Sequence, residues 1–263
     1  MKTLYVVGTG PGGKDLITPQ ALAAVEDSTD LVAYGLYMDL LGELVDSKTK
    51  HDLPLGEEIE RARLALNLAA QGKTTALLSS GDIGIYAMAT LVFELLDRQV
   101  QGLEDNPEWL EIDIQVTPGI TAMQAGASKM GALLGHDFCA ISLSDLLTPW
   151  ETIETRIKAA AMADFVVSFY NPVSTKRTWQ LGKAKEILLA HRPASTPVIL
   201  GRNLTRETEN IIITTLGELD STRVDMLTLV QIGNSASKLF STGSKEWIYT
   251  PRGYSRKLTI ATP

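Results

Sequence analysis

The stretch Leu4-Tyr5-Val6-Val7-Gly8-Thr9-Gly10-Pro11-Gly12-Gly13 decides the fold class of this chain. Its apolar first half is typical of a strand buried in a parallel sheet, and its glycines predict a tight turn where that strand ends. A helix is expected to begin at Thr18-Pro19, because threonine caps helix N-termini and proline fits the first helical position. Strand, glycine turn and helix in this order predict an α/β fold.

The same alternation continues along the rest of the chain. Further strands are predicted at 31–34, 75–79, 112–116, 138–143, 165–169, 197–201, 210–215 and 227–232, and we expect the last of these to be the final strand. Helices are predicted at 57–70, 86–96, 121–129, 150–161 and 176–190. The final strands follow one another too closely for a helix between them, so part of the second sheet should be antiparallel.

A Pro-Gly break at residues 117–119 separates the two series of elements. We therefore predict two α/β domains. Residues 1–117 should form an N-terminal domain with a mostly parallel sheet, since strand-helix alternation gives right-handed crossovers. Residues 118–263 should form a C-terminal domain with a mixed sheet.

Composition limits the class of protein. Lys plus Arg is 24 and Asp plus Glu is 31, giving a net charge of −7, which argues against nonspecific nucleic-acid binding. The single cysteine, Cys139, excludes an intramolecular disulfide, fits a reducing compartment and is expected to be a core residue. The sequence shows no zinc-like ligand spacing, no signal peptide and no apolar run of the ~18 residues that a membrane span requires. We expect a cytoplasmic protein without a metal site.

The glycine-rich turn resembles a dinucleotide-binding loop, because Gly8, Gly10 and Gly13 have the spacing G-x-G-x-x-G after a strand. Two details argue against NAD. Pro11 lacks an N–H for pyrophosphate, and the acidic residue about 20 positions on, Asp30, starts the second strand instead of ending it. The turn is therefore expected to face another ligand, with a purely structural turn or a nicotinamide-dependent oxidoreductase as alternatives.

Three more motifs follow strand ends, the edge where ligands bind in open α/β sheets. They lie at residues 78–86, 117–122 and 169–172. Asp82 in the first motif offers a carboxylate to a ligand, or it caps the helix that follows. Asn171 in the third precedes a proline and is expected to be extended, with its amide projecting from the strand end.

In this order the motifs resemble the tetrapyrrole (corrin/porphyrin) methylase family: G-x-G-P-G from residue 8, Gly-Asp at 81, Pro-Gly-Ile-Thr-Ala at 118 and Tyr-Asn-Pro at 170. The segment 136–150 is the strongest local match. It resembles the members that methylate a precorrin and contract its ring on the way to cobalamin. The resemblance implies S-adenosyl-methionine bound in a cleft between two α/β domains, a tetrapyrrole substrate and a homodimer. Action on a cobalt-loaded substrate is the open alternative.

The resemblance also implies the site residues. The S-adenosyl-methionine contacts would be Pro11, Gly81, Asp82, Ile83, Tyr86, Thr121, Ala122, Tyr170, Leu204 and Thr228. The family usually has proline at the position of Ile83, so a rigid turn is not guaranteed there. The substrate carries several carboxylates, which an acidic protein must hold with local cations. The predicted substrate-binding residues are Tyr37, Asn171, Lys176, Arg177 and Arg202.

Catalysis by positioning is expected for the methyl transfer, because a precorrin carbon is already electron-rich. Ring contraction differs, since a substrate hydroxyl loses a proton and a nearby side chain would help. Asp145 and Ser144 are the predicted catalytic residues, because they follow a strand end in the best-matching segment. The alternative for Asp145 is that it caps the helix near Pro149-Trp150.

Overall fold

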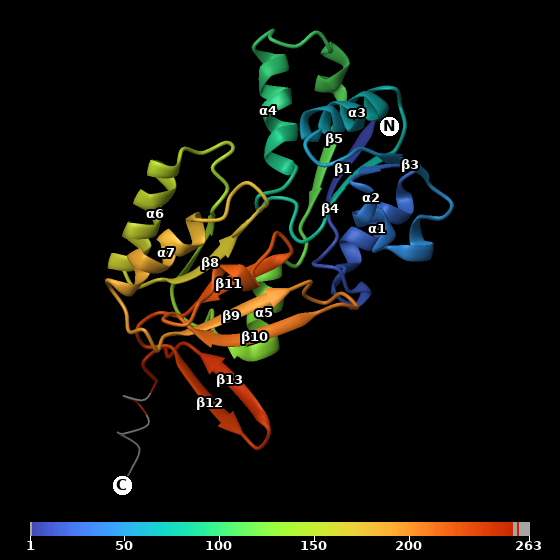
Figure 1. Cartoon of the computed structure of the whole chain (residues 1–263). Helices are drawn as coiled ribbons and strands as arrows, with labels where there is room; N and C mark the ends of the chain where they lie inside the picture. Colours follow the sequence, from blue (N-terminus) through green and yellow to red (C-terminus); the bar gives the residue numbers. More distant parts are fainter. Residues whose placement is uncertain (1, 255–256, 258–263) are drawn as a thin grey trace. The chain divides into compact units, whose positions relative to one another are not determined.

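The computed structural model describes residues 2–254 and residue 257. Its contacts divide the chain into two compact units, Met1–Ala122 and Met123–Pro263, called unit 1 and unit 2 below. Both are α/β units, as Figure 1 shows. The domain boundary predicted between residues 117 and 118 stays a prediction.

Unit 1 contains a five-stranded sheet in the order β3-β2-β4-β1-β5 in which every pairing is parallel. Its strands are β1 (Thr3–Gly8), β2 (Asp30–Ala33), β3 (Thr49–Asp52), β4 (Thr75–Ser79) and β5 (Asp113–Thr117). The prediction of a mostly parallel first sheet is confirmed. The edge strand β3 was not predicted, because its sequence Thr-Lys-His-Asp is polar and mostly exposed and carries no apolar pattern.

Helices cover both faces of this sheet (Figure 1). They are α1 (Pro19–Asp27), α2 (Gly35–Asp39), α3 (Glu58–Ala70) and α4 (Ala89–Val100), with short 3-10 helices η1 (Lys14–Leu16), η2 (Gly42–Val45) and η3 (Pro107–Glu111). Successive strand residues point to opposite faces, so Val6 packs with α3 and α4 while Val7 packs with α1. The predicted cap is present, since the Thr18 hydroxyl accepts the Ala21 amide at 3.1 Å.

Unit 2 contains a five-stranded sheet in the order β10-β9-β11-β8-β7. Its strands are β7 (Phe138–Ser142), β8 (Val166–Tyr170), β9 (Pro197–Arg202), β10 (Asn210–Thr215) and β11 (Thr228–Ile232). The pair β7–β8 is parallel, whereas β11 is antiparallel to both β8 and β9, so the prediction of a mixed sheet is confirmed. The helices are α5 (Ala122–Met130), α6 (Trp150–Met162) and α7 (Gln180–Leu189), with the 3-10 helix η4 (Ser221–Arg223).

A second, three-stranded sheet in unit 2 was not predicted. It joins β6 (Gly131–Ala132) to the hairpin of β12 (Lys238–Thr242) and β13 (Lys245–Tyr249). The expectation that 227–232 is the final strand is therefore wrong. β12 is exposed along its whole length, and its apolar residues Leu239 and Phe240 are consecutive, so they do not alternate with polar residues as in a half-buried strand.

Two helices begin later than predicted. The helix predicted from 86 begins at Ala89, because Tyr86 has a φ of 53°, which is incompatible with a right-handed helix. The helix predicted from 176 begins at Gln180, because Ser174 and Arg177 exchange main-chain hydrogen bonds of 2.9 and 3.2 Å in a tight turn. In both cases the chain makes a loop at the carboxyl end of a strand before the helix starts.

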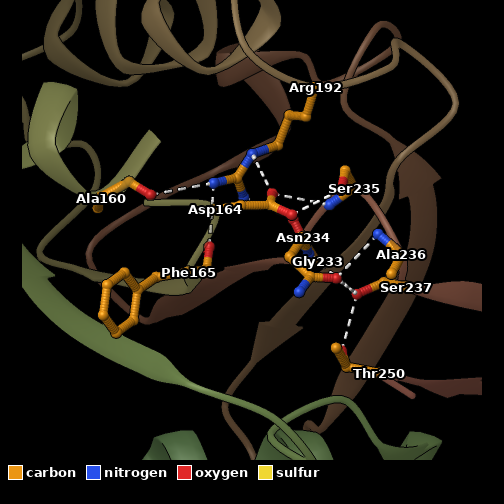
Figure 2. A network of polar contacts seen from close by, with 10 residues as sticks. All are labelled: Ala160, Asp164, Phe165, Arg192, Gly233, Asn234, Ser235, Ala236, Ser237 and Thr250. Atoms are coloured by element: carbon orange, nitrogen blue, oxygen red, sulfur yellow. Dashed lines mark hydrogen bonds and ion pairs between the residues drawn. The ribbon is translucent and has the colours of Figure 1, made fainter. Parts of the chain in front are cut away.

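A network of polar contacts around the buried Arg192 lies at the end of the unit 2 sheet where β8 begins and β11 ends (Figure 2). Arg192 donates to the carbonyl of Gly233 at 2.6 Å and to that of Phe165 at 3.0 Å. Its Nε lies 3.9 Å from a carboxylate oxygen of Asp164, which also accepts the Ser235 amide at 2.9 Å. The arginine side chain is fully buried and connects the segment before β8 with the turn after β11.

A second buried charge, Asp30 in unit 1, predicts a pH dependence of stability. Its carboxylate accepts from His51 Nε2 at 2.8 Å, from Lys73 Nζ at 2.9 Å and from the Thr29 hydroxyl. Burial alone would raise the pKa of Asp30, but these hydrogen bonds outweigh burial and leave its pKa below the ordinary value. The resulting stability is present above the carboxyl's unfolded-state pKa and is lost as the pH falls through its folded-state pKa.

We therefore expect Asp30→Asn to be less stable than the parent chain near neutral pH, and the gap to close on acidification from about pH 7 to about pH 3. Urea unfolding at a series of pH values measures this. Asp105→Asn, which changes an exposed carboxylate of the same unit, is the matched control and should show no such trend. A gap that stays constant with pH would contradict the assignment.

Candidate active site

Three turns meet at the carboxyl edge of the unit 1 sheet, where the neighbouring strands β4, β1 and β5 end. Their glycines Gly81, Gly8 and Gly119 lie backbone against backbone. A Cβ added to Gly8 would lie 2.7 Å from the Gly119 nitrogen and 2.8 Å from the Gly81 carbonyl oxygen. No side chain fits at Gly8 or at Gly119, so glycine is required at these two positions for the three turns to approach one another.

Main-chain hydrogen bonds connect the first two turns. Gly10 and Gly81 form an isolated bridge, in which the Gly10 amide donates at 3.1 Å and the Gly81 amide donates at 2.7 Å. Thr9 donates two hydrogen bonds to the Ser79 carbonyl, one from its amide at 2.9 Å and one from its hydroxyl at 3.0 Å. The glycine-rich turn after β1 is thus fixed to the end of β4 by main-chain pairing.

Asp82 connects the second turn to the third. One carboxylate oxygen accepts the Gly84 amide at 2.9 Å and the other accepts the Gly119 amide at 3.0 Å. The alternative that Asp82 caps the following helix is wrong, because α4 has Met88 at its N-cap and no side-chain capping bond. Ile83 is buried, whereas Tyr86 is half exposed on the same turn.

The other predicted residues of unit 1 lie on neighbouring segments. Pro11 and Thr121 are buried, and Ala122 is the first residue of α5. Tyr37 lies in α2, which follows β2, with its ring edge-on to Tyr34 at 5.5 Å. The structure brings Pro11, Gly81, Asp82, Ile83 and Tyr86 onto adjacent turns of one sheet edge. Their roles toward a ligand stay predictions.

Unit 2 presents a comparable edge, where β7, β8 and β9 end and the antiparallel strand β11 begins. The Tyr170 hydroxyl accepts the Met123 amide at 3.1 Å, close to the start of α5. Leu204, in the loop after β9, and Thr228, the first residue of β11, are both buried. The three residues predicted for this unit therefore share one edge of the sheet.

Arg202 at this edge already has an acidic partner. Its Nε donates to an Asp225 carboxylate oxygen at 2.7 Å, while the other oxygen accepts the Thr228 hydroxyl at 2.7 Å and the Leu227 amide at 3.0 Å. Partial burial raises the pKa of Asp225, but these donors outweigh it and hold the pKa below its usual value. A role for Arg202 toward substrate stays a prediction.

The segment after β7 carries the predicted catalytic pair. Asp145 is exposed, and one of its oxygens accepts Gln180 Nε2 at 2.9 Å. Its alternative role as a helix cap is wrong, because α6 has Pro149 at its N-cap and no side-chain capping bond. Ser144 is half-buried, and its hydroxyl accepts a nitrogen of Arg177 at 3.3 Å. Catalysis by Ser144 and Asp145 stays a prediction.

The loop after β8 differs from its predicted conformation. Asn171 has a φ of 49°, so the expectation that it is extended is wrong. Its amide points back into the protein and donates to the Ser142 hydroxyl at 3.0 Å, which links the ends of β8 and β7. Of the two cations that follow, Lys176 is exposed and Arg177 is buried.

Sequence reasoning missed three residues of these edges. Thr9 fixes the first turn through its hydrogen bond to the Ser79 carbonyl. Gly119 leaves room for the main chains of Gly8 and Gly81 to pack against it. Gln180 donates a hydrogen bond to Asp145. Gly119 carries a signal, since it stands directly after a strand in a Pro-Gly pair. Gln180 carries none, because its direction depends on where α7 begins.

Within 2–254 and 257, no group of three or more His, Cys, Asp or Glu side chains is placed to hold a metal ion. Over the same range, no helix has both the length and the hydrophobicity that a membrane crossing requires. Cys139 packs against the core of unit 2, and burial raises the pKa of its thiol.

The sequence profile of the family described as Tetrapyrrole (Corrin/Porphyrin) Methylases matches residues 3–220. The chain belongs to this family. The predicted resemblance is thereby confirmed, and so is the expectation of a methyltransferase of two-part α/β architecture. A nicotinamide-dependent oxidoreductase has no support from this membership.

Two curated relatives cover almost all of this tetrapyrrole methylase. A precorrin-3B C(17)-methyltransferase from a Sinorhizobium species is 44% identical over 254 residues, which are 96% of this chain and 97% of the relative. A probable cobalt-factor III C(17)-methyltransferase from Salmonella typhimurium is 42% identical over 252 residues, which are 96% of this chain and 99% of the relative.

Solved structures share the fold. The crystal structure of the methyltransferase CobJ matches with a TM-score of 0.84 and 38% identity, covering 95% of this chain and 98% of CobJ. A uroporphyrin-III C-methyl transferase from Thermus thermophilus, complexed with S-adenyl homocysteine, matches with a TM-score of 0.63 and 21% identity over 88% of this chain and 92% of that one. The second match shows a common fold only.

Proposed function

We propose that this tetrapyrrole methylase transfers a methyl group from S-adenosyl-methionine to C17 of precorrin-3B and contracts the macrocycle in cobalamin biosynthesis. The observation that carries the proposal is the 44% identity to a precorrin-3B C(17)-methyltransferase over nearly the full length of both chains. The same reaction on cobalt-factor III is the second candidate, favoured by the 42% identity to the relative from Salmonella typhimurium.

The turns of unit 1 support the cofactor part of the proposal. At Gly81 the φ is 76°, and an added Cβ would meet only the Thr121 Cα, at 3.9 Å. Unlike Gly8 and Gly119, Gly81 thus has no close main-chain neighbour on this side, which leaves room for a ligand to approach its main chain. S-adenosyl-methionine, when bound, supplies an electrophilic methyl group on a sulfonium. We propose that Pro11, Gly81, Asp82, Ile83, Tyr86, Thr121 and Ala122 hold it from this unit.

Tyr170, Leu204 and Thr228 are the cofactor contacts that we propose in unit 2. For the substrate, we propose that Tyr37, Asn171, Lys176 and Arg202 contribute to binding its polar and carboxylate groups. Asp145 and Ser144 are placed on the segment after β7, where an exposed carboxylate beside a hydroxyl can accept a hydrogen bond from a substrate hydroxyl. This supports their proposed role in ring contraction.

The test is a methylation assay with the purified chain. We expect the chain, with S-adenosyl-methionine, to add one methyl group to metal-free precorrin-3B, detected by mass spectrometry of the product. Cobalt-factor III, assayed in parallel, decides between the two candidates by the higher kcat/KM. Calorimetry should detect binding of S-adenosyl-homocysteine and none of NAD. If neither macrocycle gains a methyl group, the proposed function is wrong.

We also propose a cytoplasmic homodimer. The family resemblance suggests the dimer, and the use of a single cysteine is compatible with a reducing compartment. Light scattering coupled to size-exclusion chromatography measures the mass in solution and tests whether the chain forms a dimer.

A further inference from the structure

Arg177 and Lys176 are adjacent cations with opposite environments. Lys176 is exposed, whereas Arg177 is only 5% exposed. Arg177 lies in a tight turn, in which its main-chain groups and those of Ser174 exchange two hydrogen bonds. A buried guanidinium is costly unless its donors are used, so its partners indicate its role.

The partners of Arg177 come from three separate segments at one sheet edge. One terminal nitrogen donates to the Asn171 carbonyl at 2.8 Å and lies 3.5 Å from the Met226 sulfur, and the other lies 3.3 Å from the Ser144 hydroxyl. Asn171 follows β8, Ser144 follows β7 and Met226 precedes β11. One guanidinium therefore joins the loops at three neighbouring strand ends.

The segment after β7 is held at further points. The Ser142 hydroxyl accepts the Ser144 amide at 3.2 Å and the Asn171 side-chain amide at 3.0 Å. Gln180, which is 2% exposed, donates to Asp145. Each of the two predicted catalytic residues is thus held by a buried polar side chain: Ser144 by Arg177, in the loop before α7, and Asp145 by Gln180, the first residue of α7.

The electrostatics of Arg177 agree with an internal role. Burial lowers the pKa of Arg177, and the nearby Asp145 carboxylate acts in the opposite direction. Among the described residues, Nε of Arg177 has no hydrogen-bond partner. Arginine is not deprotonated in proteins, and hydrogen bonds from a charged donor are stronger than those between neutral groups.

We propose that Arg177 is a positioning residue, which fixes the Ser144–Asp145 segment against the loops that follow β8 and precede β11. This inference rests on the proposed function, in which that segment contacts the macrocycle. We propose this positioning role in place of the direct salt bridge to a substrate carboxylate that the sequence predicts for Arg177. Misplacement of a reacting group by about 1 Å can lower a rate by up to about 100-fold, so a loosened segment should affect turnover more than substrate binding.

Arg177→Met removes the guanidinium and keeps most of the side-chain volume. We expect kcat to fall by about tenfold while KM for the macrocycle changes by less than about threefold. Amide hydrogen exchange at residues 142–146 should accelerate in the same variant. Arg177→Lys retains the charge but reaches fewer acceptors, so it should show smaller changes of both kinds. It also serves as the second variant if Arg177→Met does not fold.

The matched control is Arg156→Met, which removes an exposed arginine of α6 in the same unit and should change neither readout. A raised KM with kcat and exchange unchanged would overturn the proposal in favour of direct substrate contact. Unchanged kinetics and unchanged exchange would overturn it as well. The exchange measurement needs no substrate, so it tests Arg177 even if the parent chain methylates neither macrocycle and the proposed function fails.

Discussion

The Gly119→Ala variant is expected to lose methyl transfer by about 100-fold or more, because the added methyl group displaces the turn that contacts Gly8 and Gly81. Its Cβ would overlap the Gly81 carbonyl oxygen and lie 2.6 Å from the Gly8 carbonyl oxygen. Both obstacles are main-chain atoms, which cannot rotate away. We expect the Kd of S-adenosyl-homocysteine, measured by calorimetry, to rise by at least about tenfold, which is ~1.4 kcal/mol.

A glycine outside these turns provides the control for that experiment. Gly182 lies in α7, and an added Cβ meets no atom within 4 Å. Gly182→Ala should leave binding and turnover unchanged and should stabilise the helix by roughly 0.5–1 kcal/mol, since alanine loses less backbone entropy than glycine. If Gly119→Ala binds S-adenosyl-homocysteine as tightly as the parent, the three-turn edge of unit 1 is not the cofactor site.

Replacing Arg192 with methionine is expected to lower the free energy of unfolding by about 2–4 kcal/mol. The guanidinium satisfies the carbonyls of Gly233 and Phe165, and methionine fills the space without offering a donor (Figure 2). Buried carbonyl oxygens without a donor lose the hydrogen bonds that water supplies in the unfolded chain. Denaturant unfolding measures the effect, and turnover per folded molecule should remain within about twofold.

The exposed Arg223 of η4 is the control for this loss. Arg223→Met should change the free energy of unfolding by less than about 0.5 kcal/mol, as surface substitutions usually do. An Arg192→Met variant as stable as the parent would mean that water replaces the guanidinium at both carbonyls. A variant that keeps its stability but loses turnover would contradict the expectation that this network acts on folding and not on the proposed active site.

The sequence predicted the elements that have an apolar signal of their own. β4 and β10 were located at their observed bounds, because each is a short β-branched or apolar run between turn residues. The helix start at Thr18-Pro19 was also correct, since capping is decided by local chemistry. β3 and β12 were not predicted because both are mostly exposed and neither shows an alternating apolar pattern, so their pairing partners define them.

The candidate site was predicted in part for a similar reason. The motifs located the strand ends correctly, because glycines mark turns wherever the chain folds. They could not predict that both Asp82 oxygens accept main-chain amides, since one of those amides comes from a turn 37 residues later in the chain. Nor could they show that Arg177 is buried while Lys176 is exposed, because the partners of Arg177 lie on loops that are distant in the sequence or depend on the local turn.

The two ends of the unit 2 sheet are expected to serve different purposes, stability at one end and the proposed site at the other. The first end carries the Arg192 network, and the second end carries Tyr170, Arg177 and Thr228. Substitutions at the first end should be tolerated according to their effect on folding, and those at the second end, where we propose that cofactor and substrate bind, according to their effect on catalysis. A laboratory evolution experiment could therefore select stabilising substitutions around Arg192 and, independently, substitutions near Tyr170, Arg177 and Thr228 that change which macrocycle is bound.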